Sequence, residues 1–146
     1  MKMQMPLSRS SAAMSAATFG LTLLLGTATS SLPAAAEVIV HDARGHDVAI
    51  GNTSRIVSVG GAVTEILYAL GLQDKIVGVD TTSLYPPQAM KEKPNVGYMR
   101  QLSAEGVLGL NPQLILAIEG SGPKETLDVL DNAKIPLVSF PESYSE

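Results

Sequence analysis

The sequence predicts an α/β fold, a Rossmann-like parallel sheet flanked by helices. Short apolar runs typical of buried strands alternate along the chain with stretches of helical periodicity, and most of the connecting loops are short. The run at 114–118 is apolar throughout, which is typical of a parallel strand covered on both faces. The length of 146 residues allows one ordinary domain.

A hairpin is expected first, because two β-prone runs at 38–40 and 48–50 flank a polar turn. A buried strand is predicted over 55–59. The next helix is predicted from one apolar face, which ends before Gly71 and consists of Val63, Ile66, Leu67 and Leu70.

The middle of the chain continues the alternation. A strand is predicted over 76–79. The residues from 81 to 99 include three prolines and are expected to form a loop with one helical turn at 88–91. A short helix is predicted after this loop, with Ser103 as its N-cap.

The remaining predicted elements are a strand over 114–118, a helix from Pro123 to about residue 133, and a strand over 137–140. Proline suits the first turn of a helix, where no partner exists for a backbone N–H. Another helix would continue the alternating pattern, so the chain ending at Glu146 is expected to be a fragment.

The first 36 residues have the organisation of a signal peptide. Basic residues precede an apolar stretch at 16–25, and Ala34 and Ala36 satisfy the small-residue pattern of a signal-peptidase site. That stretch is shorter than the roughly 20 residues that span a bilayer. We therefore expect cleavage near Ala36 and export of residues 37–146; the alternative is an N-terminal membrane anchor.

Composition excludes several classes of function. The first 36 residues contain two of the ten basic residues and none of the fourteen acidic ones, so residues 37–146 carry a formal charge of −6. A chain this acidic has no electrostatic reason to bind nucleic acid or anionic lipid. The absence of cysteine rules out disulfides, cysteine-ligated zinc and iron–sulfur clusters.

Several patterns are compatible with other chemistry. The Gly60–Gly61 turn follows a strand but lacks the G-x-G-x-x-G spacing of dinucleotide sites. His41 and His46 flank the hairpin turn, either as metal ligands or, more simply, as solvated side chains. Glu65 and Glu105 are candidate catalytic carboxylates of an exported enzyme, but no partner acid or base stands at a suitable spacing and solvated helix faces explain them better.

The long loop carries the most distinctive chemistry. Tyr85 precedes two prolines, and Tyr98 lies two residues before Arg100. Loops at the carboxyl ends of parallel strands are where open α/β sheets bind ligands. A guanidinium beside a phenol favours the phenolate, a hard anionic oxygen that suits ferric iron. The alternative is that Tyr98 is a loop aromatic packed over the sheet edge.

Five further segments form a recognisable set: 55–58 (RIVS), 64–71 (TEILYALG), 76–80 (IVGVD), 85–87 (YPP) and 110–115 (LNPQLI). Together they resemble the cobalamin- and siderophore-type periplasmic binding proteins, which serve ABC importers. Within that superfamily, residues 96–106 (VGYMRQLSAEG) are similar to the haemin-binding members.

The resemblance implies a bilobal protein that holds its ligand in the cleft between two α/β lobes. It implies that Tyr98 ligates haem iron, that Arg100 stabilises the phenolate, and that Tyr85 lines the cleft. Glu105 matches the N-terminal-lobe glutamate that docks onto the permease. Residues 37–146 then correspond to the N-terminal lobe alone, without the second lobe.

The implied function is that of a periplasmic carrier, not an enzyme. It would capture ferric haem (haemin) as a transported ligand and deliver it to an inner-membrane ABC permease with its ATPase, downstream of an outer-membrane haem receptor system. One alternative is a corrinoid or ferric-siderophore binder, which needs no phenolate on the metal. Another is a non-functional truncated remnant, whose exposed inter-lobe face would cause aggregation or dimerisation.

Overall fold

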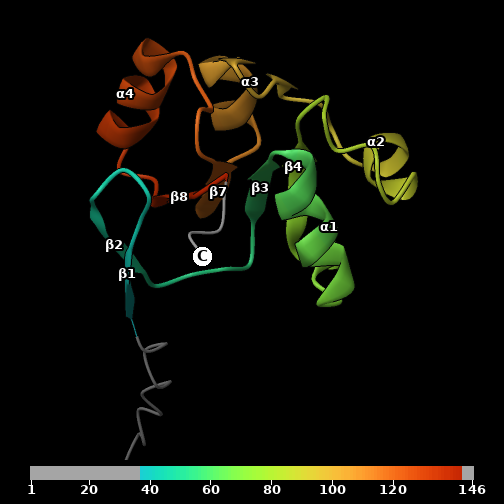
Figure 1. The fold of residues 1–146 in the computed structure, drawn as a ribbon, viewed down its shortest axis with the longest axis horizontal. Helices are drawn as coiled ribbons and strands as arrows, with labels where there is room; N and C mark the ends of the chain where they lie inside the picture. The colour runs from blue at the N-terminus through green and yellow to red at the C-terminus, as the bar shows by residue number, and fades with distance from the viewer. Residues whose placement is uncertain (1–36, 143–146) are drawn as a thin grey trace, which may run out of the picture. The chain divides into compact units, whose positions relative to one another are not determined.

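The computed structural model describes residues 37–142, and the predicted signal peptide lies outside this range. A four-stranded parallel sheet forms the centre, with the strand order β4-β3-β7-β8 (Figure 1). Its strands are β3 (Ile56–Val59), β4 (Ile76–Val79), β7 (Leu114–Ile118) and β8 (Leu137–Phe140). Each corresponds to a predicted strand, so the predicted α/β class is confirmed.

Helices cover both faces of this sheet. They are α1 (Gly61–Ala69), the 3-10 helix η1 (Gln73–Lys75), α2 (Gln88–Glu92), α3 (Ala104–Gly109) and α4 (Lys124–Asn132). Helix α1 lies on one face, and α3 and α4 lie on the other (Figure 1). Because the chain leaves the neighbouring strands β3 and β7 toward opposite faces, their carboxyl ends form the switch point where open α/β sheets bind ligands.

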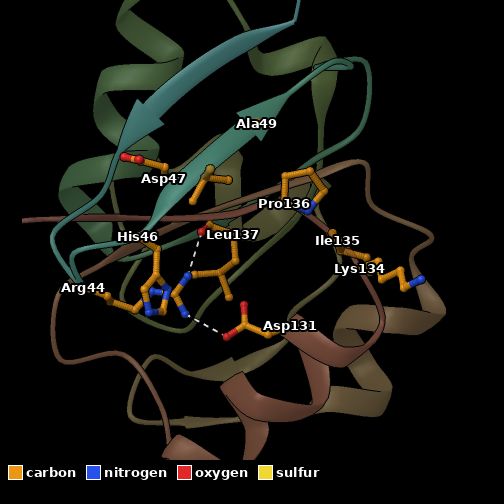
Figure 2. A pocket seen from close by; sticks show the side chains of 10 residues that line it. Arg44, His46, Asp47, Ala49, Asp131, Lys134, Ile135, Pro136 and Leu137 are labelled. Atoms are coloured by element: carbon orange, nitrogen blue, oxygen red, sulfur yellow. Dashed lines mark hydrogen bonds and ion pairs between the residues drawn. The ribbon is translucent and has the colours of Figure 1, made fainter.

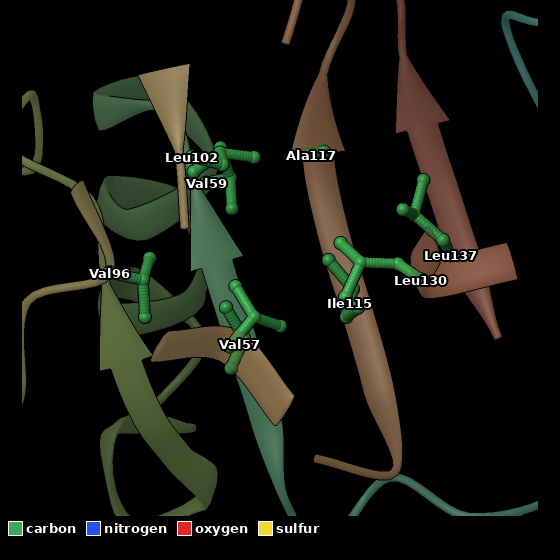
Figure 3. Packing of buried hydrophobic residues seen from close by; sticks show 9 residues of the cluster. Val57, Val59, Val96, Leu102, Ile115, Ala117, Leu130 and Leu137 are labelled. Atoms are coloured by element: carbon green, nitrogen blue, oxygen red, sulfur yellow. The ribbon is translucent and has the colours of Figure 1, made fainter. Parts of the chain in front are cut away.

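Strand side chains alternate between two hydrophobic clusters. The cluster beneath α3 and α4 consists of Val57, Val59, Val96, Leu102, Val107, Ile115, Ala117, Leu130 and Leu137 (Figure 3). The cluster on the α1 face consists of Ile56, Val63, Leu67, Ile76, Val79, Leu114 and Val138. Burying apolar surface stabilises a fold by roughly 25 cal/mol per Å², so packing on both faces fixes the strands and the edge at which they end.

The predicted N-terminal hairpin is confirmed as β1 (Val38–His41) paired antiparallel with β2 (Asp47–Ile50). Its turn lies against the edge strand β8, where the Ala43 N–H donates to the Ser139 carbonyl at 2.8 Å. The hairpin therefore satisfies part of an edge that would otherwise expose unpaired backbone groups.

Two expectations need correction. The predicted apolar face of α1 is only partly buried: Val63 and Leu67 pack on the sheet, whereas Ile66 and Leu70 are exposed. They line a groove of about 520 Å³ with side chains of β7 and β8, because one helix and a hairpin cover less of this face than two helices cover of the other.

The second correction concerns the segment predicted as loop up to residue 99. It includes β5 (Gly97–Tyr98), which pairs antiparallel with β6 (Gln101–Leu102). A ladder of two residues on each side is too short for an alternating pattern to show in a sequence. None of the helices within residues 37–142 is long and apolar enough to cross a membrane.

Candidate functional site

The β5–β6 hairpin brings Tyr98 and Arg100 into one tight turn. Tyr98 pairs with Gln101 across the hairpin, and Met99 and Arg100 form the connection between them. Tyr98 and Arg100, which are two residues apart in the sequence, are thus held in a hydrogen-bonded turn, and not in a long irregular loop.

Backbone hydrogen bonds clamp this hairpin from both sides. On one side, the Thr81 N–H, just beyond β4, donates to the Gly97 carbonyl at 2.9 Å. On the other, Gly122 in the loop after β7 donates to the Met99 carbonyl and accepts from the Leu102 N–H, both at 2.9 Å. Because both anchors follow the carboxyl ends of parallel strands, the hairpin lies at the ligand-binding edge of the sheet.

Gly97 makes the clamp possible. Its φ of 102° lies in the left-handed region, and a Cβ at this position would stand 2.9 Å from the Gln101 carbonyl oxygen. The Gly97 N–H is also satisfied, since it donates to the Asn95 side-chain oxygen at 2.7 Å. A glycine is therefore required immediately before Tyr98.

The clamp uses no side chain of the motif itself. Tyr98 retains 44% of its surface and Arg100 is also exposed. Within residues 37–142, neither the Tyr98 hydroxyl nor the Arg100 guanidinium takes part in a hydrogen bond or ion pair. The hairpin therefore presents a phenol and a cation on a fixed backbone with both groups available to a ligand.

The same edge of the sheet carries two large apolar side chains. Leu84 is 71% exposed and Tyr85 is 64% exposed, in the loop that follows β4. The N–H of Thr81, at the start of this loop, is the group that bonds Gly97. The structure thus connects Tyr85 and Tyr98 through adjoining segments of the carboxyl edge.

Glu105 lies in the first turn of α3 and is exposed. Ser103 is the N-cap as predicted, because its Oγ accepts from the Gly106 N–H at 2.9 Å. A capped helix start fixes the backbone beneath Glu105 while leaving its carboxylate in solvent. This is the placement expected of a docking residue, and it is equally that of an ordinary surface carboxylate.

The rival sites receive no support from the geometry. Glu65 and Glu105 are both exposed on helices, whereas a catalytic carboxylate with a raised pKa is expected inside a pocket. His41 Nδ1 contacts Asp47 Oδ1 at 2.8 Å, with both side chains largely exposed. Across the part of the chain that the structure describes, no three His, Asp or Glu side chains are grouped as a metal site would need.

Cavities lie elsewhere in the molecule. One, of about 390 Å³, lies between the N-terminal hairpin and the start of β8, where Arg44 reaches Asp131 Oδ2 at 3.1 Å and the Leu137 carbonyl at 2.9 Å (Figure 2). Neither this cavity, nor the smaller one beside β7, nor the α1 groove is lined by Tyr98. Tyr98 is 44% exposed outside these three cavities.

The side chain of Arg44 is held in place by a hydrogen bond to Asp42 and so stabilises the hairpin turn. Its buried carboxylate accepts from the backbone N–H groups of Arg44 and His46, both at 2.9 Å, and from Arg44 Nε at 2.9 Å. Burial alone would raise the pKa of Asp42, but hydrogen bonds from His46, Arg44 and Ser139 outweigh it and lower that pKa. Asp42 was not among the residues predicted to have a role, although an aspartate two residues before an arginine in a turn is a usable signal.

Comparisons with known proteins identify the family. Residues 56–145 match the family described as "Periplasmic binding protein". This chain belongs to the periplasmic binding protein family. It is also 40% identical over 83 residues to the vitamin B12-binding protein of Yersinia pestis (strain Pestoides F), an alignment that covers 57% of this chain and 29% of that protein.

Solved members of the periplasmic binding protein family are also similar in structure. The periplasmic heme-binding protein RhuT from Roseiflexus sp. RS-1 is 47% identical with a TM-score of 0.59, covering 62% of this chain and 35% of its own. A periplasmic heme-binding protein from Pseudomonas aeruginosa is 46% identical with a TM-score of 0.58, covering 60% and 31%. The chain thus spans about a third of the length of these relatives, and the predicted superfamily is confirmed.

Proposed function

We propose that this chain forms the N-terminal lobe of a periplasmic substrate-binding component of an ABC importer, and that its ligand is ferric haem. Tyr98 would ligate the iron, Arg100 would stabilise the phenolate, and Tyr85 would line the cleft. Capture and release change only coordination and packing, so the protein would act as a carrier and not as an enzyme.

One observation carries this proposal: Tyr98 is exposed on a hairpin whose backbone is clamped at the carboxyl edge of the sheet. An iron ligand must project toward the metal without rearrangement, and a fixed turn with a free phenol meets this need. The 46–47% identity to two periplasmic heme-binding proteins supports the same ligand.

Delivery to the permease rests on Glu105 in our proposal. The exposed carboxylate on a capped helix could pair with a basic residue of an inner-membrane permease and its ATPase, with an outer-membrane haem receptor system acting upstream. Replacing Glu105 with arginine should weaken permease binding, whereas Glu125, exposed in the first turn of α4, offers a matched control. Equal binding by Glu105→Arg and the unaltered chain would exclude this contact.

A corrinoid is the second candidate, favoured by the 40% identity to a vitamin B12-binding protein. The two ligands differ in what they require of Tyr98. Haem iron has open axial positions for a phenolate, whereas a corrinoid binder needs no phenolate on the metal. The exposed Tyr98 next to Arg100 is therefore the feature that separates them.

The test is a titration of the purified chain with ferric haemin, followed by visible absorption, beside Tyr98→Phe. A saturating one-site spectrum with a phenolate-to-iron charge-transfer band is expected, and this band should vanish in Tyr98→Phe. Tyr85→Phe is the matched control, because it removes another exposed tyrosine hydroxyl at the same edge and should keep the band.

A parallel titration with cyanocobalamin distinguishes the two ligands. Saturation by cyanocobalamin, with identical weak haemin spectra from the unaltered chain and Tyr98→Phe, would replace haem with a corrinoid. Weak binding of both ligands by this chain, and tight haemin binding by a form with a second lobe, would show that one lobe is not sufficient.

A further inference from the structure

Asp80 is a fully buried carboxylate at the carboxyl end of β4, and its role is not part of the proposed iron site. Its Oδ1 accepts from the Gly60 N–H at 2.9 Å and from Ser83 Oγ at 3.0 Å. Its Oδ2 accepts from the N–H and the hydroxyl of Thr82, at 3.0 and 2.7 Å. No basic side chain among residues 37–142 forms an ion pair with it, so these four hydrogen bonds are what make its burial tolerable.

The hydrogen bonds continue in one direction beyond the carboxylate. Thr64 Oγ1 lies 2.7 Å from both Ser83 Oγ and Ser58 Oγ. Because an ionised carboxylate only accepts, Ser83 donates to Asp80, Thr64 donates to Ser83, and Ser58 donates to Thr64. The chain of donors ties the loop after β4 to both β3 and α1.

The last loop residue in this network is followed directly by two large apolar side chains. Ser83 is fully buried, and the next two residues are Leu84 and Tyr85, which are 71% and 64% exposed. Adjacent large apolar side chains in solvent can form part of a surface that contacts a partner or ligand. Here the pair projects from backbone that is anchored one residue earlier.

The network also reaches the iron site. Asp80 is followed by Thr81, whose N–H donates to the Gly97 carbonyl at 2.9 Å, immediately before Tyr98. One buried carboxylate therefore supports both the Leu84–Tyr85 pair and the flank of the Tyr98 hairpin. Apolar residues of similar volume often stabilise a fold as much as a buried charged group does, or more. Stability alone is therefore a weak reason for a buried carboxylate at this position.

We propose that Asp80 is a positioning residue for ligand capture: it fixes the loop after β4 so that Leu84 and Tyr85 form an apolar contact for the macrocycle of the ligand. This inference rests on the proposed function. In addition to the proposed iron site, Leu84 would contact the ligand, and Asp80 would hold Leu84 in position for that contact. A flat porphyrin with a large apolar face is the chemistry that such a pair fits.

A double-mutant cycle tests the inference. Leu84→Ala should weaken haemin binding about tenfold, from the loss of roughly 50 Å² of apolar contact. Asp80→Asn places an amide N–H₂ against groups that all donate, and should also weaken binding about tenfold by releasing the loop. If Asp80 acts through Leu84, the double variant should bind no more weakly than Asp80→Asn alone.

A second pair of variants tests the same role if Asp80→Asn fails to fold. Thr82→Val removes one hydroxyl from the carboxylate and should weaken haemin binding about threefold, whereas Thr82→Ser keeps the hydroxyl and should restore it. Amide exchange at Leu84 and Tyr85 should quicken in Thr82→Val and not in Thr82→Ser.

The outcomes separate this inference from the proposed function. A Tyr98-dependent charge-transfer band with additive losses in the cycle would overturn the positioning role alone. Absence of that band both in the unaltered chain and in a form with a second lobe would overturn the proposed function, and this inference with it. Unchanged binding in both Leu84→Ala and Thr82→Val would likewise overturn the inference while leaving the iron ligand in place.

Discussion

The protein contains two small hairpins that are attached to the same sheet by different means. In the N-terminal hairpin, turn side chains make most of the attachment, beside one backbone bond from Ala43 to Ser139: buried Asp42 binds Arg44, His46 and Ser139, and Arg44 bridges to Asp131. In the β5–β6 hairpin, backbone groups make most of the attachment, beside side-chain hydrogen bonds of Asn95 and Thr126, and the turn side chains Tyr98 and Arg100 stay exposed.

The difference shows how a fold can free side chains for a ligand. A turn whose side chains are used internally contributes stability but has no group left to bind anything else. A turn anchored by main-chain hydrogen bonds keeps a fixed position whatever its side chains are. The two hairpins should therefore respond to substitution in opposite ways, one in stability and the other in binding.

The largest expected effect on stability is that of Asp42→Ala. It removes a buried acceptor of four hydrogen bonds and leaves the half-buried Arg44 without its closest partner, so the free energy of unfolding should fall by about 3 kcal/mol. Urea denaturation measures this loss. Asp131→Ala is the matched control, because that exposed contact to Arg44 should contribute no more than about 1 kcal/mol.

If Asp42→Ala and Asp131→Ala destabilise equally, the N-terminal hairpin is not held by its buried carboxylate. Haemin binding gives a second check. The haemin spectrum of folded Asp42→Ala should match that of the unaltered chain, because Asp42 contacts the hairpin and β8 and not the Tyr98 edge.

A somewhat smaller loss is expected from Gly97→Ala. The new Cβ meets both a left-handed backbone and the Gln101 carbonyl, so the free energy of unfolding should fall by about 2 kcal/mol. Gly45→Ala, in the turn of the other hairpin, also has a positive φ but meets nothing within 4 Å, and should cost about 1 kcal/mol. Only Gly97→Ala should also weaken haemin binding; an effect of Gly45→Ala on haemin would contradict the division between the hairpins.

Acid should lower the free energy of unfolding by protonating the Asp42 carboxylate in the N-terminal hairpin. The folded-state pKa of Asp42 lies below its ordinary value of 3.8, so its stabilisation is complete above about pH 3.8 and is lost as the pH falls through the lowered value. Unfolding free energies measured from pH 6 down to pH 2 should decline more steeply in the unaltered chain than in Asp42→Asn. Parallel curves would show that Asp42 is not a source of the acid sensitivity.

The sequence predicts the regular elements well and the attachments poorly. Strand 114–118 and the Ser103 cap follow from local composition, and both are confirmed. Ile66 and Leu70 belong to the predicted apolar face of α1 but are exposed, because periodicity reports an apolar face and not what covers it. Asp42 and Asp80 each have local partners, but their bonds to Ser139 and Gly60, which join distant segments, could not be read from the sequence.

The site shows the same limit. The Tyr98–Arg100 spacing and the resemblance to haemin-binding proteins indicated a candidate ligand, which remains a prediction. The backbone clamp did not follow from the sequence, since Thr81 and Gly122 contribute main-chain groups that carry no residue-specific pattern. What a sequence records is side-chain chemistry, and the clamp that leaves Tyr98 exposed is made mainly by backbone hydrogen bonds.

The smallest effect on stability is expected from Arg100→Gln. Arg100 is exposed and makes no ion pair with any residue in 37–142, so the free energy of unfolding should change by less than about 0.5 kcal/mol. The loss of a cation beside Tyr98 should nonetheless weaken the phenolate-to-iron band in a haemin titration at pH 7, while Arg100→Lys should keep it. An unchanged band in Arg100→Gln would mean that Tyr98 needs only the backbone clamp to ligate iron. The positive charge of Arg100 would then not contribute to that ligation.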